Sequence, residues 1–263
     1  MIRTLHSELI DNLPADHPGA IQTRRDLRRI NALMGHAGIL TRSLRKIFPQ
    51  FPPSRILEIG AGDGELLLRV ARRWIKSQTS HPHENATQFH PLPEGEGRGE
   101  GEGIASPPRF PPVDVLFIDL QNLVRPETIT DFAALSWRVR AVEADIFDWL
   151  TNTAGEKIDV ILANLVLHHF TDAQLSTLFA AAAARCNAFV AVEPRRSAWP
   201  LFWTRRLSLI GCGPATCHDA PVSVQAGFTG RELSALWPQD GTWELTERSA
   251  GLFSHLFVAQ RKG

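Results

Sequence analysis

Hydrophobic and polar positions follow two periodicities along this chain, which predict strands alternating with helices. Short, mostly apolar stretches predict strands at residues 56–59, 113–120, 139–144, 158–163, 189–192, 243–248 and 255–260. Apolar residues at helical spacing predict helices at 65–75, 126–135 and 172–185. Thr171 suits the N-cap of the last helix, and Gln174 completes a capping-box pattern. The alternation indicates an α/β fold, with a parallel sheet covered on both sides.

The stretch 21–48 predicts two further amphipathic helices, separated where Gly35 and Gly38 interrupt the apolar spacing. Its outer face carries four arginines, Arg24, Arg25, Arg28 and Arg29. A solvated helix face is the simpler interpretation of this run. The alternative is a small patch that faces an anionic substrate or partner.

Residues 77–112 differ from the rest in composition. They are rich in Pro and Gly and contain few large apolar side chains. Such a stretch buries too little surface to offset the entropy of ordering it, so we interpret it as a disordered insertion. Surface loops tolerate insertions of this kind without a role in function.

Charge and cysteine content narrow the class of protein. The chain has 28 Lys and Arg against 28 Asp and Glu, which argues against a general nucleic-acid binder. Three cysteines do not form a disulfide framework, so a reducing compartment is expected. The start of the chain lacks a signal-peptide pattern, and no apolar window is long enough for a membrane span. We therefore expect a cytoplasmic protein, and the sequence leaves its oligomeric state open.

A glycine loop follows the first predicted strand. The dinucleotide fingerprint G-x-G-x-x-G fails here, because its third glycine position is Glu65. The pattern is instead E-x-G-x-G-x-G, formed by Glu58, Gly60, Gly62 and Gly64. A glycine loop between a strand and a helix lets the backbone approach the phosphates or sugars of a cofactor.

Residues 55–65, RILEIGAGDGE, resemble motif I of class I S-adenosylmethionine-dependent methyltransferases. That family has an acid at the end of its second strand, about 20 residues beyond the glycines. Asp119 ends the next strand here, 55 residues after Gly64, and leaving out the 36 residues of 77–112 reduces this separation to 19. The insertion and the resemblance therefore support each other.

Later segments resemble other motifs of the same family. They are residues 143–147, which follow the third strand, 159–164 with the tail Leu167-His168-His169-Phe170, and 190–194 at the end of the fifth strand. The resemblance covers about residues 54–260. It implies a Rossmann-like, doubly wound sheet of seven strands, parallel except for one antiparallel C-terminal strand. We expect an N-terminal helical cap over residues 1–50 and a methyltransferase domain over 51–263.

The resemblance also implies how S-adenosylmethionine is held. Glu58 anchors the ammonium end, and Gly60 and Gly62 allow close backbone approach. Asp119 accepts both ribose hydroxyls, unless it is a plain strand-end acid, and the helix N-terminus takes the carboxylate. Asp145 accepts from the adenine amino group, unless it only caps the next helix. The full set of expected cofactor residues is Glu58, Gly60, Ala61, Gly62, Gly64, Asp119, Leu120, Asp145, Ile146 and Asn164.

Catalysis by this family is an in-line displacement, so positioning the acceptor matters more than acid–base chemistry. A general base is needed only when the acceptor loses a proton. His168 and His169 are the candidates, and the alternative is that they pack in the loop or start a helix. His218 beside Asp219 is a second, weaker candidate. The C-x4-C-H spacing from Cys212 to His218 lacks a fourth ligand, so no metal is expected.

Two stretches of the sequence bear on the methyl acceptor. Residues 195–237 are rich in aromatic side chains, which suits a hydrophobic small-molecule acceptor but equally suits core packing. Residues 24–35 and 218–228 resemble bacterial methyltransferases encoded beside polyketide synthases, which implies a phenolic or polyketide-derived acceptor. Asn164 is followed by Leu165-Val166, so the Asn-Pro-Pro-aromatic motif of DNA-adenine and protein-glutamine methyltransferases is absent.

Three alternatives to a small-molecule methyltransferase stay open. One is a protein that binds S-adenosylmethionine without catalysis, and another is an RNA methyltransferase. The third, a nicotinamide-dependent oxidoreductase, is weakened by Glu65 in the glycine loop.

Overall fold

The computed structural model describes residues 1–79, 111–152 and 157–263. The predicted insertion at 77–112 lies almost wholly outside these ranges. The strands are β1 (Arg55–Ile59), β2 (Val113–Asp119), β3 (Trp137–Glu143), β4 (Ile158–Asn164), β5 (Cys186–Pro194), β6 (Trp243–Ala250) and β7 (Ser254–Arg261). The α-helices are α1 (Pro18–Leu33), α2 (His36–Ile47), α3 (Glu65–Thr79), α4 (Pro126–Ala133), α5 (Ile146–Asn152), α6 (Asp172–Ala183), α7 (Ala198–Thr204), α8 (Pro214–Ala226) and α9 (Glu232–Leu236). Short 3-10 helices are η1 (Ile10–Asn12), η2 (Leu167–His169) and η3 (Leu207–Ile210).

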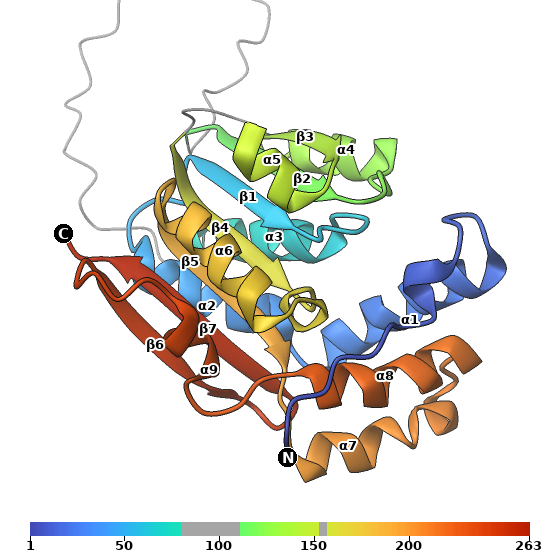
Figure 1. Ribbon diagram of the computed structural model, residues 1–263. Helices are drawn as coiled ribbons and strands as arrows, with labels where there is room; N and C mark the ends of the chain where they lie inside the picture. Colours follow the sequence, from blue (N-terminus) through green and yellow to red (C-terminus); the bar gives the residue numbers. More distant parts are fainter. Residues whose placement is uncertain (80–110, 153–156) are drawn as a thin grey trace, which may run out of the picture.

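The seven strands form one sheet in the order β3-β2-β1-β4-β5-β7-β6 (Figure 1). The first five are parallel, β7 runs antiparallel to both of its neighbours, and β6 is parallel to the rest. The predicted doubly wound sheet with one antiparallel C-terminal strand is therefore confirmed. Chain direction across the sheet reverses between β1 and β4, which is where open α/β sheets bind ligands at the carboxyl ends of their strands.

Two hydrophobic cores lie on the two faces of the sheet. One packs α2, α3 and α4 against it, and the other packs α5, α6 and α9. Trp237 and Phe228, which sequence reasoning left between acceptor site and core, are both 1% exposed and belong to the second core. The capping box of Thr171 and Gln174 is present at α6 as predicted.

The helices of the predicted cap occupy two different places. Helix α2 packs in the layer of α3, with Leu40 and Leu44 fully buried against the sheet. Helix α1 lies beyond the strand ends, and Figure 1 shows it above α8, with α7 on the outside. Gly35, with a φ of 70°, is the N-cap between α1 and α2, whereas Gly38 lies inside α2. The division at residue 50 into cap and domain stays a prediction.

Candidate functional site

The glycine loop connects β1 to α3 at the point where chain direction reverses. Gly60 and Gly62 have φ values of 65° and 56°, in the left-handed region that favours glycine. A Cβ on Gly60 would lie 2.8 Å from a methyl group of Val166, so this glycine lets the loop pack on the segment after β4. A Cβ on Gly62 would meet no atom within 4 Å. Open space therefore lies over Gly62, where sequence reasoning expects a cofactor.

Asp119 at the end of β2 faces this loop. Its Oδ2 accepts a hydrogen bond from the Gly62 amide at 2.8 Å, and its Oδ1 accepts one from Gln121 at 3.2 Å. A carboxylate has about four acceptor positions, so both oxygens keep capacity for a diol. Leu120, the next residue, is exposed. The structure thus brings Asp119 to the glycine loop, as the shortened spacing requires.

Glu58 on β1 is buried beneath the loop. Its Oε2 has no hydrogen-bond partner among the described residues. Burial, with the negative charges of Asp63 and Asp119, raises the pKa of Glu58 to about 8. A cationic donor placed against this carboxyl group would favour its ionised form.

Asn164 ends β4 on the other side of the reversal point. Its Nδ2 donates to Asn31 Oδ1 of α1 at 3.4 Å. Its buried Oδ1 makes no hydrogen bond of ordinary geometry in the described chain, but it interacts with the ring of the buried His36. Glu58 and Asn164 both line one cavity of about 140 Å³ with Gly60, Ala61 and Gly62. The unpartnered oxygen of Glu58 in this cavity fits a ligand group that carries a hydrogen-bond donor.

Helix α1 closes this cavity from above. Arg28 pairs with Asp63 of the glycine loop, and Arg24, Leu27 and Asn31 also line the cavity. The predicted arginine run is therefore divided, because Arg24 and Arg28 face the loop whereas Arg25 and Arg29 are exposed. Cavities that hold organic ligands have volumes of about 300 Å³ or more. This cavity is smaller than that, so a whole cofactor would extend beyond it.

Asp145 and Ile146 lie at the end of β3, away from this cavity. Asp145 is exposed, and its Oδ1 accepts from the amide of Phe147 at 2.7 Å. It caps α5, which is the alternative that sequence reasoning considered. A contact with adenine stays a prediction, as does the backbone contact assigned to Ile146.

The two histidines after β4 have different surroundings. His168 is buried, with Nδ1 2.7 Å from Glu193 Oε2 and Nε2 3.4 Å from Glu8 Oε1. Burial opposes its charge, but the two carboxylates prevail and raise the pKa of His168 to about 9. His169 is more exposed and lies 3.6 Å from Asp11 Oδ2 through Nδ1. His168 keeps its proton in this arrangement and does not suit a general base.

Ligand atoms of Glu8, His168 and His169 lie within 4.8 Å of one another. A metal ion there would compete with the proton that His168 holds between its two carboxylates. The two carboxylates are those of Glu8 and Glu193. Glu193 also accepts hydrogen bonds from the backbone amides of Val166 and Leu167, at 3.1 and 2.9 Å. We interpret the group as an ion network that holds η2 and the N-terminal segment together.

The second histidine candidate also serves the N-terminal segment. His218 Nδ1 lies 2.9 Å from Asp219 Oδ1, so the adjacent pair forms a contact. Asp219 accepts in addition from the backbone amides of Leu9 and Ile10. Cys217 Sγ donates to the Cys212 carbonyl at 3.6 Å. Asp219 therefore joins residues 9–10 to α8 by hydrogen bonds.

Sequence reasoning missed several residues of this site. Leu165 has a φ of 54°, which is strained for a residue with a side chain and is found most often at functional sites. Asp26 of α1 is fully buried and accepts from the Gly213 amide and the Thr216 hydroxyl, which joins α1 to α8. Neither residue has a local pattern that signals its role. Glu193, near the end of β5, likewise has no local pattern that signals its contacts with the segment after β4.

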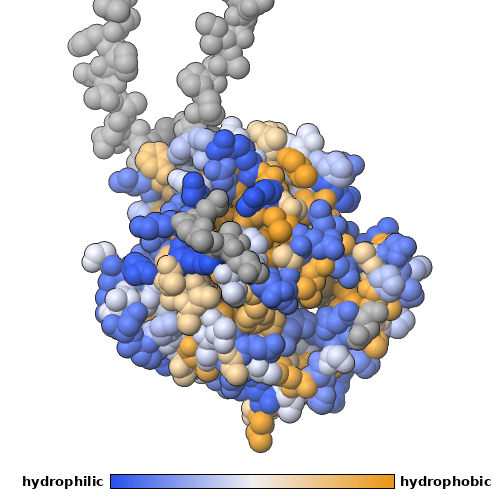
Figure 2. Space-filling view, turned by 45° about the horizontal axis from the view of Figure 1, so that its top comes forward, coloured by the Kyte–Doolittle hydropathy of each residue, from blue (hydrophilic) through white to orange (hydrophobic). Residues whose placement is uncertain are grey.

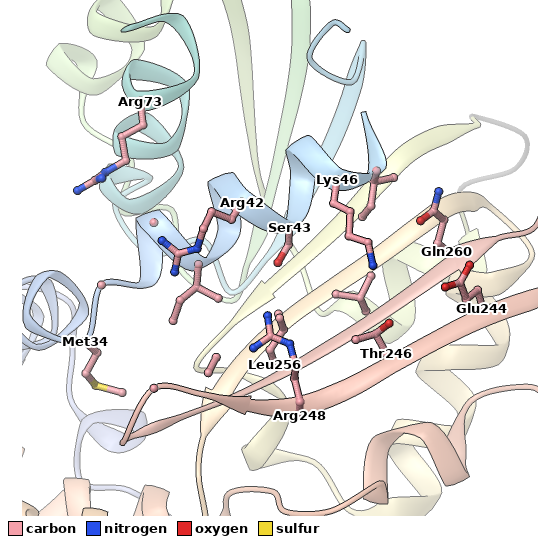
Figure 3. A pocket seen from close by; sticks show the side chains of 17 residues that line it. Met34, Arg42, Ser43, Lys46, Arg73, Glu244, Thr246, Arg248, Leu256 and Gln260 are labelled. Carbon is pink, nitrogen blue, oxygen red and sulfur yellow. The ribbon is translucent and has the colours of Figure 1, made fainter. Parts of the chain in front are cut away.

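A larger cavity, of about 640 Å³, lies elsewhere on the molecule, between α2 and strands β6 and β7. Figure 3 shows Arg42 of α2 and Arg248 of β6 extending toward each other across it, with Lys46 beside them. No residue of the glycine loop lines it. It is therefore separate from the candidate cofactor site.

Comparison with known proteins supports the fold. No family model matches the sequence, and no curated protein matches it either. An O-methyltransferase family protein from Burkholderia thailandensis matches 94% of this chain at 17% identity and a TM-score of 0.53, although the chain covers only 62% of that protein. Magnesium protoporphyrin IX methyltransferase from Synechocystis, solved with bound S-adenosylhomocysteine (SAH), matches over 94% of this chain and 96% of its own at 11% identity and a TM-score of 0.54. The plantazolicin methyltransferase BpumL, also in complex with SAH, matches over 94% of this chain and 92% of its own, at 13% identity and a TM-score of 0.57. The chain therefore has the fold that these methyltransferases share.

Proposed function

We propose that this protein is an S-adenosylmethionine-dependent methyltransferase that acts on a small, hydrophobic acceptor of phenolic or polyketide-derived type. The observation that carries the proposal is the unpartnered buried oxygen of Glu58, Oε2, in the cavity beside the glycine loop. The ammonium group of a bound amino acid offers three donors, one of which suits this carboxyl group.

The remaining site residues fit the other parts of the same cofactor. Asp119 would accept the ribose hydroxyls, and the space over Gly62 would admit the chain between ribose and amino acid. Arg28, which already faces the loop, and the amides that begin α3 would hold the carboxylate. When bound, S-adenosylmethionine supplies a methyl group activated by a positively charged sulfur.

The chain's own residues would position the acceptor. The segment from Leu165 to His169 follows β4 and is held in place by Glu193, so it forms a rigid wall beside the cofactor site. His169 is the group that could accept a proton from a phenolic hydroxyl. His168 would keep its proton and act only through its position.

The experiment that tests this function is methyl transfer from S-adenosylmethionine carrying a labelled methyl group. We expect label in phenols or quinones that bear apolar substituents, and none in tRNA. Transfer to tRNA alone would overturn the acceptor class. No transfer to any acceptor, with SAH still bound, would favour a binding protein without catalysis.

The His169→Gln variant extends the same assay. It should lower kcat on a phenol, while the KM for the cofactor stays unchanged. An unaltered kcat would remove His169 from the proposed mechanism.

A further inference from the structure

Helix α7 and the following η3 expose a group of large apolar side chains that the cofactor site does not use. We name it the α7 surface, and it consists of Trp199, Phe202, Trp203, Leu209 and Ile210, with exposed fractions of 43 to 80%. Three of its rings contact one another, with centroids 5.7 to 6.1 Å apart. Contiguous apolar surface of this kind on a folded protein marks an interaction site.

The N-terminus extends this surface. The side chain of Arg196, two residues before α7, donates to the Met1 carbonyl at 3.0 Å, and the neighbouring Ile2 is 89% exposed. Figure 1 places the N-terminus beside the start of α7. Figure 2 shows hydrophobic residues protruding at the same lower end of the molecule.

The charged side chains that flank these rings along the chain have one sign. From residue 194 to 218 the chain has four arginines and no Asp or Glu. Arg205 is exposed at the end of α7, and Arg206 lies over the ring of Phe202, with its guanidinium carbon 3.5 Å from the ring centroid. Arg196 is the exception among the four, because it is buried and pairs with Glu232.

We propose that the α7 surface docks this protein on a lipid bilayer that contains anionic headgroups. Trp and Phe side chains with flanking arginines are the composition that lies at the boundary of headgroups and acyl chains. The rings would enter that boundary, and Arg205 and Arg206 would pair with lipid phosphates. Among the described residues no helix is long and apolar enough to cross a membrane, and surface docking requires none.

Two other occupants of the α7 surface fit less well. A symmetric pair of chains would bring Arg205 and Arg206 of each copy close to those of the other, which is repulsive. The methyl acceptor itself would have to reach the cofactor from α7, but α8 packs against both α7 and α1 and separates the exposed rings from the glycine loop.

Co-sedimentation of the full chain with vesicles tests the proposal. We expect binding to vesicles of equal parts phosphatidylcholine and phosphatidylglycerol, at least tenfold weaker binding to phosphatidylcholine alone, and a loss of affinity as salt rises. Substitution of Trp199, Phe202 and Trp203 by Ser should lower affinity for the mixed vesicles at least tenfold. Arg205→Glu, which removes no packed side chain, should do the same.

Controls separate docking from folding and from general charge. Arg248→Glu changes the same charge in the distant cavity of Figure 3 and should leave vesicle binding unchanged. All variants should keep the wild-type affinity for SAH, so failure of the proposed methyl transfer would not affect this test. Absence of wild-type binding to mixed vesicles, or equal binding by the α7 variants, would overturn the proposal. So would a dimer in light scattering that the α7 variants dissociate without any vesicle binding.

Discussion

At the scale of single residues, Glu58 and His168 show how buried surroundings determine the charge of a side chain. Glu58 is a buried acid without a partner, whereas His168 is a buried base with two acidic partners. Burial shifts the pKa of Glu58 upward, and the carboxylates of Glu193 and Glu8 shift that of His168 upward as well. The same direction of shift has opposite consequences, because Glu58 becomes neutral near pH 7 and His168 becomes charged.

Glu58 should make binding of the proposed cofactor depend on pH. In the free protein it holds a proton below about pH 8, and the ammonium group of the ligand would favour the ionised form. Binding therefore releases a proton, and the affinity for SAH should rise with pH by up to about tenfold per unit below pH 8. Calorimetry between pH 6 and 7.5 in buffers of different ionisation enthalpy measures this proton. Glu58→Gln should bind more weakly and without the pH slope, and a wild-type slope in that variant would contradict the assignment.

His168 should make the free energy of unfolding decrease as pH rises. Its pKa is raised to about 9 in the folded chain and has its ordinary value when unfolded, so the stabilisation is complete below about pH 6.5 and is lost as pH rises through 9. The full effect is about 3 kcal/mol. Urea unfolding should show His168→Gln less stable than wild type at pH 6.5 and close to it at pH 9.5. His169→Gln is the control, and an equal loss in both variants would show that the ion network is not the cause.

At the scale of elements, α1 lies over the candidate site. It contacts the glycine loop through Arg28 and Asp63, and it is joined to α8 through the buried Asp26. The cavity beneath it, of about 140 Å³, is smaller than a whole cofactor needs, so the proposed cofactor would extend beyond it.

The attachment through Asp26 should contribute strongly to stability. Asp26→Ala would leave the Gly213 amide and the Thr216 hydroxyl buried without an acceptor, at a cost of about 1–3 kcal/mol each. We expect a loss of about 3 kcal/mol in the free energy of unfolding. Asp16→Ala, at an exposed position before α1, is the control and should change stability by less than about 0.5 kcal/mol. Equal stability of the two variants would contradict the role of Asp26.

The contact between Arg28 and Asp63 should affect the rate of ligand release, whereas Asp26 affects the stability of the fold. Removal of a partly exposed ion pair costs up to about 1 kcal/mol, which corresponds to about fivefold in rate. Arg28→Ala should therefore speed the release of SAH up to about fivefold, as measured by stopped-flow competition. Arg25→Ala removes an exposed neighbour on the same helix and should leave the release rate unchanged. Faster release from both variants would point to a general effect of charge.

At the scale of the whole molecule, the sequence predicts the sheet, the reversal point and the meeting of Asp119 with the glycine loop. Strand periodicity and the spacing of Asp119 from the glycines suffice for these, because the carboxyl ends of parallel strands must meet at one edge. Asp26 and Glu193 could not be assigned in this way. Their partners are 187 and 25–27 residues distant along the chain, so a single sequence has no local signal for the contact. The exposed rings of α7 likewise needed the structure, since their composition suits a core equally well.

Calorimetric titration of SAH into the wild-type chain and into Asp119→Asn tests the central claim most directly. The variant keeps an oxygen that can accept from the Gly62 amide, so the loop should stay in place while the charge that would hold the ribose is lost. We expect one SAH per wild-type chain, no binding of NAD, and about 10- to 100-fold weaker binding of SAH by the variant, the effect of losing charged hydrogen bonds. Absence of wild-type binding at millimolar SAH would contradict the account, and unchanged affinity in Asp119→Asn would show that this strand end does not hold the cofactor.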